Sequence, residues 1–213
     1  RNARLDPASS VRAGALRALG RMGASAVDSI EARLDDPEPQ VRMAAIGALV
    51  DADYAHAAVR LERYMVAAPN PEGVESARAL LSADTERAPL PARTQLARAL
   101  IHSDGALRSQ AAVALMSLHE PRFEALILKR APHEGARAVR LCLALALAAD
   151  HPQRRALLVT LMQLDDMSAA QAASELALRG EPAASQKLAA LLHSKTPSIR
   201  STVVRALAHG LGR

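Results

Sequence analysis

A unit of about 30 residues recurs along the whole 213-residue chain, and this periodicity restricts the possible folds more than any other feature. Its clearest copy, residues 36–49, is an acidic turn with two prolines followed by an alanine-rich segment. The equivalent positions, 30 to 33 residues apart, are Val11, Val41, Val74, Leu107, Val139, Ala169 and Ile199. One such unit cannot bury its apolar face alone, so the sequence predicts a stack of copies.

Each copy is predicted to begin with a proline-containing turn and to continue as an amphipathic helix. Proline is tolerated in the first helical turn because its missing N–H would have no partner there. In the copy at 36–49 the apolar residues fall on one face, at the i, i+4, i+7, i+8 spacing of Val41, Ala45, Ala48 and Leu49. The third copy has Arg78 at the Ala45 position, which predicts a rotated or shifted helix there.

A second set of helices is predicted between these copies, so that each repeat is a helical hairpin. The expected ranges are 25–34, 54–68, 90–101, 122–130, 152–163 and 182–193. The aromatic content is only Tyr54, Tyr64 and Phe123, and the apolar mass is Ala, Leu and Val, which suits closely packed helices.

The pattern resembles the HEAT-repeat family, and specifically the short bacterial HEAT-like repeats that are also found in phycobilisome lyases. The residues that carry the resemblance are Asp6-Pro7, Val11-Arg12, Ala15 and Ala18-Leu19-Gly20, repeated as Asp36-Pro37, Val41-Arg42, Ala45 and Ala48-Leu49. The resemblance implies an all-α fold, a right-handed α-solenoid of about six and a half helical hairpins. We expect a single solenoid over residues 1–213 that is a segment of a longer protein, because the chain starts within a repeat.

An acidic residue stands six positions before an arginine in Asp6–Arg12 and Asp36–Arg42, with Glu134–Arg140 as a variant. This spacing is similar to the Asp/Arg ladder of the family. The resemblance implies that the carboxylate caps a helix start and pairs with an arginine of its own or an adjacent repeat. We therefore assign a structural role to Asp6, Arg12, Asp36, Arg42, Arg108, Glu134, Arg140 and Arg200.

A partner-binding column is predicted beside the repeated apolar stripe, because in HEAT folds the second helix of each hairpin lines the concave side. Its members are Arg17, Gly47, Leu80, Val113, Leu145, Glu175 and Arg205, with Arg21 one turn after Arg17. The centre of the column is apolar and would suit the apolar face of a partner helix or peptide. The alternative is that the array curls there and buries Leu80, Val113 and Leu145 between repeats.

Nucleic acid is the second partner that the charge pattern allows. The net charge of +5 is concentrated at the two ends of the chain, in Arg12, Arg17 and Arg21 and in Lys195, Arg200 and Arg205. The middle of the chain is mildly acidic, and three scattered aromatic residues offer little for base stacking. We therefore rank a protein partner above nucleic acid.

Enzymatic functions receive little support from the sequence. HEAT-like di-iron hydroxylases use several His-Glu pairs on different repeats, whereas this chain has only His119-Glu120 and His133-Glu134. Chromophore-lyase activity is implied only by the repeat type. Nucleophilic triads and phosphate-binding loops are absent from the sequence, and the single Cys142 is expected to be a small buried hydrophobe.

We therefore expect a non-enzymatic scaffold or adaptor that needs no cofactor or metal and binds another protein or peptide. No apolar run reaches the length of about 18 residues that a membrane span requires. We expect a cytoplasmic location.

Overall fold

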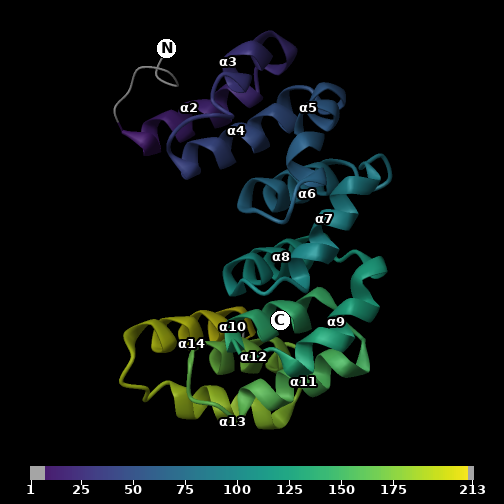
Figure 1. Ribbon diagram of the computed structural model, residues 1–213. Coiled ribbons are helices and arrows are strands. Elements are labelled where there is room, and N and C mark those ends of the chain that lie inside the picture. The colour runs from purple at the N-terminus through teal and green to yellow at the C-terminus, as the bar shows by residue number, and fades with distance from the viewer. Residues whose placement is uncertain (1–7, 211–213) are drawn as a thin grey trace. The chain divides into compact units, whose positions relative to one another are not determined.

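The computed structural model describes residues 8–210, and within them all regular secondary structure is helical (Figure 1). The helices are α2 (Ser9–Gly20), α3 (Val27–Glu31), α4 (Pro39–Ala52), α5 (Tyr54–Val66), α6 (Pro71–Ala83), α7 (Leu90–Leu100), α8 (Gly105–Leu118), α9 (Glu124–Arg130), α10 (Arg137–Ala146), α11 (Pro152–Met162), α12 (Met167–Ala177), α13 (Pro182–Leu191) and α14 (Pro197–Gly210). In the described part of the chain, α2 is followed by six consecutive helix pairs. The predicted all-α fold of about six and a half hairpins is therefore confirmed, while its handedness stays a prediction.

The boundaries of the intervening helices follow the predicted ranges closely. Helices α5, α7, α11 and α13 begin at the predicted residue and end one or two residues earlier than expected. Two segments begin as short 3-10 turns, Gly23–Ala26 before α3 and Pro121–Phe123 before α9. Asn70 and Asp166 start their helices as N-caps, each accepting a hydrogen bond from a backbone N–H three residues later.

The chain divides into two compact units, residues 1–118 and 119–213. In the first unit, α2, α4, α6 and α8 stack in sequence as one layer, and α5 and α7 pack together on the other side (Figure 1). Its fully buried side chains include Leu16, Ile46, Leu49 and Leu61. In the second unit, α10 to α14 enclose a core with Leu158, Leu161, Ala173, Leu188 and Val203. A single solenoid over residues 1–213 stays a prediction.

Helix α6 is shifted by one residue relative to the predicted alignment, as Arg78 suggested. The buried residues Gly73, Ala77 and Leu81 correspond to Val41, Ala45 and Leu49 of α4 at a constant spacing of 32 residues instead of 33. The start of the helix shifts with them, since Pro71 opens α6 as Pro39 opens α4. In this register Arg78 corresponds to Ile46 instead of Ala45, and its side chain is 36% exposed and paired with Glu75.

Gly73 marks the closest approach of α6 to its neighbours. A Cβ atom at this position would lie 2.5 Å from the backbone oxygen of Tyr64 and would also overlap the side-chain amide of Gln95, which is fully buried. The contact with Tyr64 involves backbone, so it cannot be relieved by a side-chain rotation. Glycine at 73 therefore allows α5, α6 and α7 to pack together.

Replacing Gly73 with alanine should lower the free energy of unfolding by about 1–3 kcal/mol, the usual cost of overpacking a buried site. Gly47→Ala is the matched control, because a Cβ at Gly47 meets nothing within 4 Å. That control should raise stability by about 0.5–1 kcal/mol through helix propensity. Urea unfolding monitored by circular dichroism measures both; a Gly73→Ala protein as stable as Gly47→Ala would contradict the close contact.

Candidate functional site

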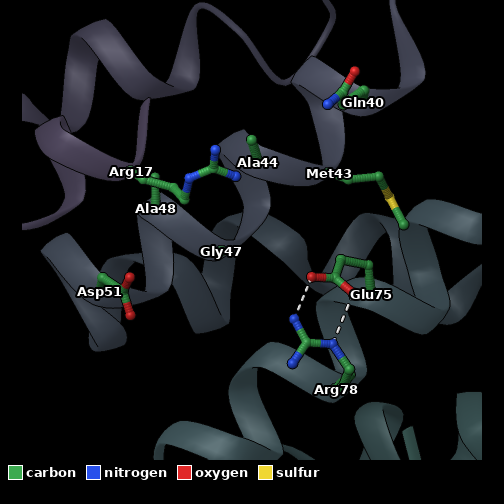
Figure 2. Close-up of a pocket in the computed structure, with 9 residues that line it drawn as sticks. All are labelled: Arg17, Gln40, Met43, Ala44, Gly47, Ala48, Asp51, Glu75 and Arg78. Atoms are coloured by element: carbon green, nitrogen blue, oxygen red, sulfur yellow. Dashed lines mark hydrogen bonds and ion pairs between the residues drawn. The ribbon is translucent and has the colours of Figure 1, made fainter. Parts of the chain in front are cut away.

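Two adjoining hollows mark the surface of the first unit where α2, α4, α6 and α8 stack. The first, of about 520 Å³, is lined by Arg17, Gln40, Met43, Ala44, Gly47, Ala48, Asp51, Glu75 and Arg78 (Figure 2). The second, of about 260 Å³, is lined by Met43, Val74, Glu75, Arg78, Ser109, Gln110 and Val113. Because they share Met43, Glu75 and Arg78, the two hollows form one depression, which we call the groove.

The groove has a floor of small residues and apolar side chains along its length. Ala44, Gly47 and Ala48 of α4 lie in the first hollow (Figure 2). A Cβ atom added to Gly47 would meet nothing within 4 Å. Met43 lies between the hollows, and Val113 in the second is 45% exposed. This combination lets another chain approach the helix backbone closely and gives it apolar surface to cover.

The charged residues of the groove are of two kinds. Glu75 and Arg78 neutralise each other through two hydrogen bonds, Arg78 Nε to Glu75 Oε2 at 2.8 Å and Nη2 to Oε1 at 2.5 Å (Figure 2). The hydrogen bond to Glu75 raises the pKa of Arg78, so the guanidinium stays charged. Arg17 and Asp51 are exposed and make no ion pair or side-chain hydrogen bond with any described residue. They are therefore available to a ligand.

The predicted column is only partly on this surface. Arg17 and Gly47 lie in the first hollow and Val113 in the second, and Arg21 is exposed just after α2 ends; their role in binding stays a prediction. Leu80 was wrongly placed: it is 0% exposed, because the one-residue shift of α6 puts it at the position of the buried Ala48. The alternative prediction, that the apolar residues at the centre of the column are buried, therefore holds for Leu80.

The remaining members of the column lie in the second unit. Leu145 on α10 is half-buried, and its carbonyl accepts a hydrogen bond from Arg154 at 3.0 Å. Glu175 on α12 pairs with Arg154 at 3.1 Å and approaches Arg179 at 3.8 Å. Arg205 on α14 is exposed. Glu175 is thus engaged within its own unit.

The predicted column omits several residues of the groove. Met43 and Asp51 lie one helical turn before and after Gly47, and the 3.6-residue period places them beside it. Glu75 would have been found by aligning α6 on its initial proline, since this alignment sets Glu75 against Met43. Gln110 carries no comparable sequence signal.

The arginine ladder links neighbouring repeats in the first unit. Arg12 on α2 donates from Nε and Nη2 to the carboxylate of Asp36 at 3.3 and 3.0 Å. Arg42 on α4 donates in the same way to Glu72 of the next repeat, with Nε at 2.9 Å from Oε1. Arg12 and Arg42 thus each pair with a carboxylate of an adjacent repeat, and the structural role of the ladder as a whole stays a prediction.

The spacing of six residues has a different origin from the predicted one. Four ladder arginines donate to the backbone carbonyl of the residue six positions earlier: Arg42 to Asp36, Arg108 to His102, Arg140 to Glu134 and Arg200 to Ser194. These bonds satisfy carbonyls in the turn before the helix, so a carboxylate at that position is not required. The carboxylate of Glu134 binds Arg130 at 2.8 Å, and Asp6 lies outside the described residues.

Asp36 is almost completely enclosed, with a side chain only 2% exposed. Burial acts to raise its pKa, but hydrogen bonds from Arg12 and the Glu38 N–H and the charges of Arg12 and Arg33 outweigh burial. The pKa of Asp36 is consequently lowered from its usual range. The carboxylate is thus ionised at neutral pH and holds α2 against the start of α4.

The two His-Glu pairs considered for metal binding do not gather further ligands. His119 and His133 are exposed, whereas Glu120 and Glu134 are buried. In the part of the chain that the structure describes, no three His, Cys, Asp or Glu side chains come together to hold a metal ion. Cys142 is half-buried, and burial raises the pKa of its thiol.

Stacked helical hairpins joined by an arginine ladder define a repeat protein of the α-solenoid class. Comparison with known families agrees, because residues 2–82 match the family model of HEAT repeats. The predicted resemblance to the HEAT-repeat family is confirmed over residues 2–82, while the phycobilisome-lyase subtype stays a prediction. No curated protein matches the chain. Over residues 8–210, none of the helices has both the length and the apolar character needed to cross a membrane.

Replacing Asp36 with asparagine should lower the free energy of unfolding by about 1–3 kcal/mol at pH 7, because Arg12 loses a charged acceptor. Since the folded-state pKa of Asp36 is lowered, its contribution is complete above the unfolded-state pKa of about 3.9 and is lost as the pH falls through the lower folded value. The difference between the two proteins should therefore shrink below about pH 4.

Asp35→Asn is the matched control for this measurement. The Asp35 side chain is 79% exposed and lies 3.4 Å from Arg63, so its loss should change stability by less than about 0.5 kcal/mol. Denaturant unfolding between pH 3 and pH 7 would test both variants. A deficit for Asp36→Asn that does not depend on pH would show that Asp36 acts through packing and not through its charge.

Proposed function

We propose that this protein is a non-enzymatic scaffold that binds a segment of another protein in the groove of its first unit. HEAT repeats commonly serve as protein-interaction scaffolds. The observation that carries the proposal is that Arg17 and Asp51, which form no ion pair with any described residue, flank an apolar hollow with a floor of alanine and glycine. Such a site combines close approach, apolar contact and charges that orient the ligand.

The geometry favours an extended or helical segment with both an apolar and a charged part. Met43 and Val113 offer apolar contact along α4 and α8, so a partner with apolar residues at regular spacing covers both hollows. Arg17 and Asp51 differ in sign, and we expect the partner to carry an acidic and a basic residue to match them. Since Glu75 and Arg78 already satisfy each other, they contribute shape more than charge.

Nucleic acid remains the alternative partner, and the described contacts favour it less than a protein. Arg12 is engaged with Asp36, so of the basic residues at the start of the chain Arg17 and Arg21 stay exposed. Asp51, which lines the same hollow as Arg17, would repel phosphates lying along the groove. A mobility shift of duplex DNA or RNA at about 50 mM salt that weakens steeply as salt is added would favour this alternative.

The double variant Met43→Asp/Val113→Asp should weaken partner binding by at least about tenfold, because two charges replace the apolar contacts of the groove. The control is Val59→Asp/Val66→Asp, whose side chains are 77% and 59% exposed on α5, away from the groove. Affinity capture with each protein, quantified by mass spectrometry, would identify partners lost only with the groove variant. Equal capture by all three folded proteins would remove the groove from consideration.

A further inference from the structure

Two fully buried polar side chains lie in neighbouring helices of the first unit. Ser76 on α6 and Gln95 on α7 are both 0% exposed. The Ser76 hydroxyl and both amide atoms of Gln95, Oε1 and Nε2, have no hydrogen-bond partner among the described residues. A buried polar atom without a partner is costly, because it has lost its bonds to water and gained none in return. These three atoms therefore destabilise the packed state of α6 and α7.

Water does not reach the Gln95 amide while α6 and α7 are packed together. Both amide atoms are closed to the bulk solvent. The amide also lies so close to Gly73 of α6 that a Cβ atom on this glycine would overlap it. A gap that is too small for a carbon atom is too small for a water molecule. Moving α7 away from α6 would open the amide to water and restore its hydrogen bonds.

The side-chain hydrogen bonds of α7 do not hold it against α6. Arg93 donates to carbonyls of the turn before α7, and Arg98 donates from Nη1 to the carbonyl of Ala67 at 3.2 Å. By contrast, α4 and α6 are joined by the ion pair of Arg42 with Glu72 at 2.7 Å. Among the described residues, the contact between α6 and α7 consequently depends on apolar packing alone.

Helix α7 has little stability of its own. It has 11 residues, and an isolated helix shorter than about 12–15 residues is marginal in water. Its N-cap residue, Pro89, provides no side-chain hydrogen bond, whereas Asp53 and Asn70 cap α5 and α6 in this way. Once separated from α6, α7 should therefore lose its helical hydrogen bonds.

We propose that α7 detaches from α6 and unwinds while α4, α6 and α8 stay stacked, so that the first unit has a built-in local opening. The opening hydrates Ser76 and Gln95, which offsets part of the apolar contact that is lost. Helix α6 also carries Glu75 and Arg78 into the groove. Loss of its neighbour α7 leaves this wall of the groove less constrained, so the opening is coupled to the shape of the groove.

Hydrogen–deuterium exchange of the 213-residue chain, followed by mass spectrometry, tests this opening. Residues 90–100 should exchange at least about tenfold faster than residues 39–52 and 105–118, whose helices stay stacked. Below about 1 M urea the exchange of residues 90–100 should depend little on urea, because a local opening exposes little surface. Exchange of residues 90–100 that matches the other two segments in rate or in urea dependence would overturn the proposal.

Two variants remove the unpartnered atoms. Gln95→Met keeps the length of the side chain without its amide and should slow the exchange of residues 90–100 by at least about tenfold. Ser76→Ala removes the hydroxyl without adding volume and should slow it by at least about threefold. If neither variant slows this exchange, the proposal is wrong.

Each variant has a matched control. Gln171 on α12 is exposed, and the Ser117 hydroxyl already bonds to the Ala114 carbonyl at 2.8 Å. Gln171→Met and Ser117→Ala should therefore not slow the exchange of residues 90–100. Circular dichroism verifies that every variant is folded. No partner is added in these measurements, so their outcome does not depend on the proposed scaffold function.

Discussion

The bond between a guanidinium and the turn carbonyl six residues before it is the interaction on which the repeats depend. This bond satisfies a carbonyl that the helix geometry leaves without an intrahelical partner. It also holds the guanidinium so that, in Arg42, the remaining N–H groups point to Glu72 of the next repeat. One side chain thus stabilises both the turn of its own repeat and the contact with its neighbour, which explains why this spacing recurs.

The groove results from the same stacking of repeats and from the one-residue shift of α6. With Ala45 in the buried stripe, α2 and α4 pack closely, and Ala44 and Gly47 form a low floor beside them. In α6 the register shifts by one residue, so Glu75 takes the position of Met43 and lines the groove together with its partner Arg78. The irregular helix α6 therefore contributes the paired charges of the groove, whereas the regular helices α2 and α4 contribute its packed small residues.

Most of the fold could be predicted from the sequence because its signals are local. Proline-led turns and the 3.6-residue apolar period lie within each helix, and they placed α5, α7, α11 and α13 within two residues. The position of Leu80 could not be predicted with an alignment based on Val74, because burial depends on which turn of α6 meets α4. The carboxylate partner of Arg42 could not be predicted either, because Glu72 belongs to a different repeat and only the stacking of repeats brings it beside Arg42.

Repetition also explains why the groove can differ from one repeat to the next. A unit that stacks on its neighbours must present two complementary faces, and in α4 Val41, Ala45 and Leu49 are buried for this reason. Arg17 and Asp51 are exposed beside these buried positions, so their side chains can change without loss of the contacts that hold the helices together.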